Sequence, residues 1–300
     1  MKNLTRVLTE ILKSESLGLS LDFSRVENVN EQEFVKILKF CTPHDVQNIF
    51  ASGLINNGLV KEDSALRKKL KNELLISLSR YERSEYEFSA ICNAFEQNAI
   101  PFLPLKGVIL RDYYDKPNLR TSSDIDIFIN EKDVKRAVAV LREEHGYTLK
   151  ENGIAEVSLF SPSGVHLELL YAIKDRDAKE NEMIKDFSSS FSVKNGKKYQ
   201  YEMSLEYFYA YCIAHTARHF KNKGTGIRSI LDVYVMNNKF ALDAKKLSLL
   251  LKKYDLTEFE SHLRKLCAVW FDGDKIEETT SLLEKYILFS GAYGTTENFI

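Results

Sequence analysis

The sequence has no apolar run long enough to cross a membrane, and no continuous apolar segment typical of a signal peptide follows its N-terminus. Its four cysteines lie far apart, without the Cys-x-x-Cys spacing that would indicate a metal site or a redox pair. They are most simply buried thiols in a reducing compartment. We therefore expect a cytoplasmic protein with no membrane partner.

The chain also lacks an excess of charge of either sign. It carries 42 Lys and Arg residues against 43 Asp and Glu residues, a formal net charge of −1. No global field therefore draws it to nucleic acid or to a membrane, and only a local basic groove could do so. No internal repeat or low-complexity linker interrupts the 300 residues, which suffice for a sizeable core.

The spacing of apolar residues predicts an α+β protein in three parts. Residues 1–98 read as a helical region, and Thr42-Pro43-His44-Asp45 is expected to begin a helix within it. Residues 99–172 hold short apolar strands separated by turns, with a helix between Asn130 and Gly146. Residues 173–300 return to helix.

The most informative stretch is the strand predicted over Asp124–Ile129. Its isoleucines share one face, and Asp124 and Asp126 share the other. The two carboxylates are then about 6–7 Å apart along the strand. Such a pair repels itself unless a cation lies between, and Mg²⁺ prefers oxygen ligands. The alternative is an edge strand with a solvated acidic face, although Asp is a poor strand former.

A third acidic residue comes from the hairpin predicted over Ala155–Tyr171. His166, Glu168 and Leu170 share one face of its second strand. If that strand pairs beside the Asp-x-Asp strand, Glu168 completes a carboxylate triad, which can hold two metal ions and take a proton from an acceptor. Otherwise Glu168 is a surface strand residue.

Residues suited to phosphate precede the acidic strand. Lys106-Gly107 ends an apolar strand and opens a short helix, where glycine admits close backbone approach and free amides favour an anion. Arg120 and the hydroxyls of Ser122 and Ser123 could hold further phosphate oxygens. The alternative for Arg120 is an ion pair within a loop.

Taken together, these residues resemble the bacterial nucleotidyltransferase-like proteins of the DNA polymerase β superfamily, and are similar to the nucleotidyltransferase toxins of abortive-infection systems. The resemblance covers residues 95–171 well and extends more loosely to about residue 235. It implies a nucleotidyltransferase fold, a small mixed sheet with helices on one side. The motifs that carry it are Leu105-Lys106-Gly107, Tyr113-Tyr114, Arg120-x-Ser122 and Asp124-Ile125-Asp126-Ile127.

The resemblance also implies roles for individual residues. Asp124 and Asp126 match the metal-binding pair of the family and Glu168 its third carboxylate, while Lys106 and Gly107 stand at its phosphate-binding turn. The implied reaction uses Mg²⁺, with Mn²⁺ as an alternative ion. It moves a nucleoside monophosphate from a nucleoside triphosphate such as ATP to a hydroxyl and releases pyrophosphate. The acceptor stays open between a small molecule, a tRNA end and a protein side chain.

Two positions depart from the family pattern. Val108 replaces the second small residue of the phosphate turn, and Leu170 stands where relatives often carry His. These departures support an alternative function, a catalytically degenerate nucleotidyltransferase fold that binds a nucleotide or a partner without turnover. A second alternative, a sugar-nucleotide glycosyltransferase, needs an α/β region before the Asp-x-Asp motif, whereas the preceding residues here read as helices.

The C-terminal region adds one candidate. His215 and His219 lie one helical turn apart, a spacing that suits a metal, but no third ligand is evident. We interpret their helix as lining the cleft, with His215 near the nucleotide or acceptor. Arg228 and Asp232, also one turn apart, are expected to pair with each other.

Overall fold

The computed structural model describes residues 2–175, 178–222 and 224–291. The chain forms two compact units that interleave along the sequence. Unit 1 comprises Met1–Leu78, Asp112–Thr121 and Cys212–Ile300, and unit 2 comprises Ser79–Arg111 and Ser122–Tyr211. The division of the sequence at residues 98 and 172 stays a prediction.

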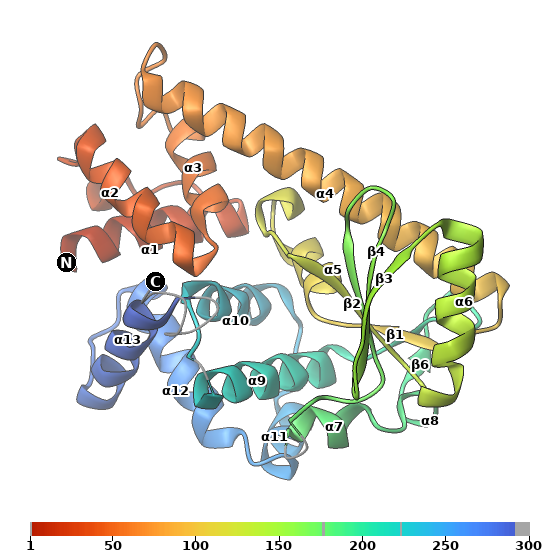
Figure 1. The fold of residues 1–300 in the computed structure, drawn as a ribbon. Coiled ribbons are helices and arrows are strands. Elements are labelled where there is room, and N and C mark those ends of the chain that lie inside the picture. Colours follow the sequence, from red (N-terminus) through yellow and green to blue (C-terminus); the bar gives the residue numbers. More distant parts are fainter. Residues whose placement is uncertain (1, 176–177, 223, 292–300) are drawn as a thin grey trace. The chain divides into compact units, whose positions relative to one another are not determined.

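A five-stranded mixed sheet forms the centre of unit 2 (Figure 1). Its strand order is β1-β2-β5-β4-β3; β2 and β5 run parallel, and the other neighbours are antiparallel. The predicted α+β class and the β4–β5 hairpin are therefore confirmed. The strands are β1 (Phe102–Pro104), β2 (Asp124–Ile129), β3 (Thr148–Asn152), β4 (Glu156–Phe160) and β5 (His166–Leu170).

One face of this sheet is the hydrophobic core of unit 2. Alternate residues of β2, β4 and β5 point into it, because side chains of a strand alternate between its faces. Residues of the long helix α4 (Ala65–Gln97) and of α6 (Val134–His145) complete the core. Gly146 ends α6 in a left-handed conformation, as predicted. The opposite face carries the polar residues of β2, β4 and β5 together with Phe128, Phe160 and Leu170.

Shorter elements complete unit 2. They are α5 (Gly107–Leu110), the 3-10 turn η5 (Glu131–Asp133), α7 (Lys179–Ile184), α8 (Phe187–Ser190) and the small hairpin of β6 (Ser192–Val193) with β7 (Tyr201–Glu202). The Glu96 carboxylate at the end of α4 accepts hydrogen bonds from three successive backbone amides, those of Lys198, Tyr199 and Gln200. The loop before β7 is thereby fastened to the helix that covers the sheet.

Unit 1 is helical. In this unit α1 (Lys2–Leu17) packs against α3 (Gln47–Asn56). The two helices approach closely at Gly53, where an added Cβ would lie only 2.3 Å from the Ile11 side chain. Helices α4 and α9 (Leu205–Asn222) contribute residues to both units. The remaining helices are α2 (Glu31–Cys41), α10 (Ile227–Lys239), α11 (Ala244–Lys253), α12 (Thr257–Cys267) and α13 (Glu278–Ser290). Among the described residues, no helix combines the length and the apolar character needed to cross a membrane.

The helix start predicted at Thr42 is wrong. Thr42–His44 forms a single 3-10 turn, and α3 begins only at Gln47. Asp45 ends the turn with a φ of 53°, a left-handed conformation that interrupts the helix. Its carboxylate accepts hydrogen bonds from Thr121 and Arg228 rather than capping the following helix.

The preceding residue, His44, is buried in unit 1 and is held as a neutral imidazole. Its Nδ1 accepts a hydrogen bond from the backbone N–H of Ile227 at 3.3 Å. Burial lowers the pKa of His44 to about 4. Protonation of His44 in the native protein would therefore remove the Nδ1 acceptor of Ile227 and place a charge in the core.

We expect this burial to make unit 1 acid-sensitive. As the pH falls from about 6.5 to about 4, the unfolded chain takes up a proton at His44 that the native protein does not bind. Unfolding becomes easier by up to about 3 kcal/mol over that window. In His44→Gln the amide oxygen can still accept from Ile227. This variant should lose this part of the pH dependence of the unfolding free energy, as measured by urea titrations at several pH values. The control His262→Gln, at a partly exposed position of α12, should keep the wild-type pH dependence. An equal pH dependence of the unfolding free energy in wild type and His44→Gln would contradict the prediction.

Candidate functional site

The parallel pairing of β2 with β5 assembles the polar face of the sheet. In its register Asp124 lies opposite His166, and Asp126 lies opposite Glu168. Because the intervening residues point into the core, these four side chains share the opposite face. Antiparallel pairing with β4 adds Ser158 directly opposite Glu168. The predicted proximity of the Asp-x-Asp strand and the Glu168 strand is therefore present in the structure.

Three of these side chains lie close enough to share a cation. One ligand atom each from Asp124, His166 and Glu168 lies within 4.8 Å of the others, and all three side chains are partly buried. Asp126 is engaged differently: its Oδ2 lies 3.6 Å from the Lys106 ammonium, with 13% of the Asp126 side chain exposed. The sequence singled out the three carboxylates and Lys106 but not His166.

The cluster is crowded with negative charge. Burial raises the pKa of Glu168 to about 7, and the neighbouring carboxylates of Asp126 and Asp124 add to the effect. Burial also raises the pKa of Asp126, against the opposing effect of Lys106. Ionising all of these groups together is unfavourable without a further positive charge. A divalent cation at this face would supply it, and the oxygen donors present are the kind that such ions bind.

The environment of His166 fixes its ring. Its Nε2 lies 2.6 Å from the Ser158 hydroxyl oxygen, and the ring stacks on Phe160 with centroids 4.9 Å apart. Burial lowers the pKa of His166, although Asp124 opposes the shift, so the neutral imidazole is favoured. The sequence signal for this residue was its shared face with Glu168; its position opposite Asp124 follows only from the strand register.

The predicted phosphate turn lies beside the acidic strand. The Leu105 N–H donates to the backbone oxygen of Asp126 at 3.0 Å, and α5 begins directly afterwards at Gly107. Lys106 takes a φ of 37°, which is strained for a residue with a side chain. Val108, the departing position of the turn, is buried in the core of unit 2. Its side chain therefore serves packing.

The two serines before Asp124 differ. The Ser122 hydroxyl donates to the backbone oxygen of Asp124 at 2.9 Å and lies 3.3 Å from its Oδ1. Ser123 is exposed. Ser122 thus steadies the start of the acidic strand, and the roles of Gly107, Ser122 and Ser123 in phosphate binding stay predictions.

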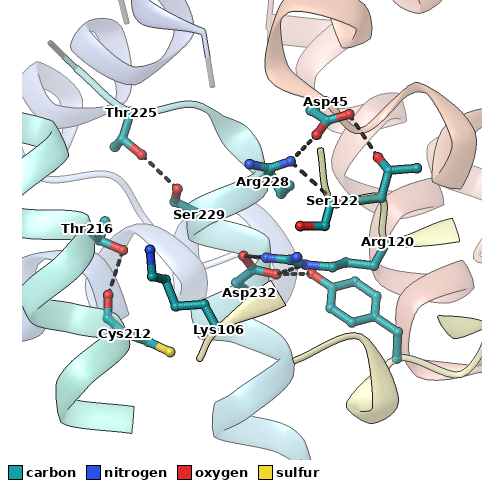
Figure 2. A network of polar contacts seen from close by, with 12 residues as sticks. Asp45, Lys106, Arg120, Ser122, Cys212, Thr216, Thr225, Arg228, Ser229 and Asp232 are labelled. Carbon is teal, nitrogen blue, oxygen red and sulfur yellow. Dashed lines mark hydrogen bonds and ion pairs between the residues drawn. The ribbon is translucent and has the colours of Figure 1, made fainter. Parts of the chain in front are cut away.

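Arg120 belongs to unit 1 and forms a buried ion pair there (Figure 2). Its Nε and Nη2 donate to the two carboxylate oxygens of Asp232 at 3.2 and 2.9 Å, and the Tyr114 hydroxyl donates to the same carboxylate at 2.6 Å. The structure thus shows the ion pair that was the alternative for Arg120, and phosphate binding by it stays a prediction. The expected Arg228–Asp232 pair is wrong, because Arg228 pairs with Asp45 (Figure 2).

His215 also belongs to unit 1. The Arg218 guanidinium lies 3.0 Å from the His215 Nδ1, and the rings of His215 and His219 pack edge to face with centroids 4.3 Å apart. The three residues form one polar cluster on α9. Its role toward a nucleotide or acceptor stays a prediction.

Comparison with known proteins identifies the class. A family model described as an uncharacterised nucleotidyltransferase matches residues 30–272, so the chain belongs to that family. The resemblance in the sequence is thereby confirmed. A solved structure of the antibiotic-resistance factor ANT(2'')-Ia is similar over 58% of this chain and 95% of its own, with 14% identity and a TM-score of 0.37. No curated protein matches the chain.

We expect Glu168→Gln to stabilise the metal-free protein. Between its ordinary pKa of 4.5 and about 7, the unfolded chain loses the Glu168 proton while the native protein retains it, so wild-type stability falls as the pH rises. Removing the charge should gain about 1 kcal/mol at pH 8, after a discount for partial exposure, and little at pH 4.5. Thermal unfolding in chelator at both pH values measures the gain. Glu151→Gln, exposed on β3, is the control; a matching gain there would contradict the prediction.

We expect Arg120→Lys to destabilise unit 1. Lysine keeps the charge but lacks the planar fork that bonds both oxygens of Asp232. The weakened buried pair should lower the free energy of unfolding by about 1–3 kcal/mol in urea titrations. Arg264→Lys, on α12, where the arginine side chain is 60% exposed and lies 3.8 Å from Glu260, should change it by less than about 0.5 kcal/mol. Equal changes in the two variants would show that the Arg120 fork is unimportant.

Proposed function

We propose that this protein transfers a nucleoside monophosphate from a nucleoside triphosphate to a hydroxyl acceptor, releases pyrophosphate and depends on a divalent cation. The observation that carries the proposal is the juxtaposition of Asp124, Asp126 and Glu168 on two paired parallel strands. Membership of a nucleotidyltransferase family supports the reaction class. The Lys106 ammonium beside this face adds a group suited to phosphate oxygens.

The residues present fit a divalent cation. Asp124, Asp126 and Glu168 would hold it, with Mg²⁺ as the expected ion and Mn²⁺ as an alternative. Burial, and after it the charges of Asp126 and Asp124, raise the pKa of Glu168, and a bound cation would relieve the repulsion among these carboxylates. When bound, the cation supplies positive charge at the transferred phosphate and lowers the pKa of an attacking hydroxyl.

The proposed transfer is an in-line displacement. The acceptor oxygen attacks the α-phosphorus and forms the new O–P bond. The bond from the α-phosphorus to the bridging oxygen breaks, and its electron pair leaves with pyrophosphate. Glu168 takes the acceptor proton, because a carboxylate with a pKa of about 7 is about half ionised at neutral pH and is basic enough to accept one.

Phosphate positioning falls to the turn before the acidic strand. The flexible stem of Lys106 allows its ammonium to turn from Asp126 toward phosphate oxygens, and Gly107 leaves the adjacent backbone open to close approach. Holding the triphosphate in this way serves catalysis by orientation.

The proposal predicts metal-dependent nucleotide binding that requires the acidic strand pair. Each of the four nucleoside triphosphates is titrated calorimetrically with Mg²⁺ into wild type, Asp124→Asn and Asp126→Asn. We expect binding of at least one nucleotide to weaken about a hundredfold or more in both variants, because each removes a proposed cation ligand. Glu151→Gln should bind as wild type does. Equal affinity in wild type and both Asp variants would contradict the proposed site.

Turnover is tested with the nucleotide that binds. The α-³²P-labelled triphosphate is incubated with separate pools of small hydroxyl compounds, tRNA and protein. Label transfer by wild type but not by Asp124→Asn identifies both the activity and the acceptor class. Tight nucleotide binding without transfer to any pool would favour the catalytically degenerate alternative.

A further inference from the structure

The three side chains that could together hold a cation include a nitrogen donor. They are Asp124, His166 and Glu168, whose ligand atoms lie within 4.8 Å of one another. His166 enters because the parallel register places it directly opposite Asp124. The donor set is therefore two carboxylates and one imidazole rather than carboxylates alone.

The surroundings of His166 resemble those of a metal-binding histidine. Such histidines use one ring nitrogen for the metal and bind a neighbouring polar group through the other, which fixes the tautomer and the ring orientation. Here Nε2 of His166 lies 2.6 Å from the Ser158 hydroxyl oxygen. In the tautomer in which Nε2–H donates to that oxygen, Nδ1 keeps its electron pair for a cation. Stacking on Phe160 restrains the ring further. The imidazole is thus oriented before any cation arrives.

The remaining carboxylate of this face, Asp126, has a different partner. The Asp126 carboxylate lies beside the Lys106 ammonium, at 3.6 Å, so part of its charge is already balanced. The neighbouring Asp124, His166 and Glu168 keep a compact set of donor atoms. The nitrogen atom is accordingly one of the three nearest donors, where it can influence which cation is bound.

We propose that His166 is a cation ligand and that it makes this site prefer a divalent transition-metal ion over Mg²⁺. The inference rests on the proposed function, because Asp124 and Glu168 hold the cation in both. Mg²⁺ is a hard ion that strongly prefers oxygen, whereas first-row transition ions accept imidazole readily. Ser158 acts as a positioning residue through its bond to the ring.

The test measures cation binding without nucleotide. Mn²⁺ and Mg²⁺ are titrated calorimetrically into the full-length wild type, His166→Gln and Ser158→Ala. We expect His166→Gln to weaken Mn²⁺ binding about tenfold or more while Mg²⁺ affinity changes less than about threefold, and Ser158→Ala to produce a smaller loss of the same kind. His145→Gln, on α6 of the same unit, should leave the Mn²⁺ to Mg²⁺ affinity ratio unchanged.

Spectroscopy provides a second readout, which does not depend on measured affinities. Electron spin echo measurements on bound Mn²⁺ should show coupling to a nitrogen nucleus, altered by ¹⁵N labelling and lost in His166→Gln. Wild type that binds no Mn²⁺, or binds it without nitrogen coupling, overturns the proposal. An unchanged affinity ratio in folded His166→Gln does the same.

The outcomes also separate this inference from the proposed function. Nucleotide binding and transfer that require Asp124, but with no nitrogen coupling, would leave the transferase standing and remove His166 from the site. Nitrogen-coupled Mn²⁺ without binding or transfer of any nucleotide would do the reverse.

Discussion

The parallel pairing of β2 with β5 is the constraint on which the rest of the site depends. One register sets Asp124 beside His166 and Asp126 beside Glu168, and the same register buries the alternate apolar residues of both strands in the core of unit 2. A slip by one residue would move every side chain of a strand to the other face. Core packing and site assembly are therefore fixed by the same hydrogen bonds. Burial of the apolar face stabilises the register that positions the polar side chains.

The polar face of the sheet carries an electrostatic cost. Three carboxylates converge on it, with Lys106 paired to one of them, and burial raises the pKa values of Asp126 and Glu168. Strongly perturbed acids of this kind cluster at functional sites, where stability is given up for chemistry. The strained backbone at Lys106 lies at the same place. The core beneath, built from the strands and from α4 and α6, supports this unfavourable arrangement.

Unit 1 uses charge in a different way. Around α10 the charges are paired: Arg120 donates to both oxygens of Asp232, Tyr114 donates to the same carboxylate, and Arg228 pairs with Asp45. These bonds tie the short segment Asp112–Thr121 and the Asp45 turn to α10 within the unit. The charges here are matched with partners, in contrast to the unbalanced carboxylates of the sheet.

The sequence by itself determined the features that depend on neighbours along the chain. The two-residue period of Asp124–Ile129, the β4–β5 hairpin and the stop at Gly146 follow from local spacing and turn chemistry, and the combined motifs indicated the family. Only the tertiary structure decided which distant groups meet. His166 lies in the cluster with Asp124 and Glu168 because of the strand register. Arg228 pairs with Asp45 and not with Asp232, one helical turn away, because long-range packing outweighs a weak pair along a helix.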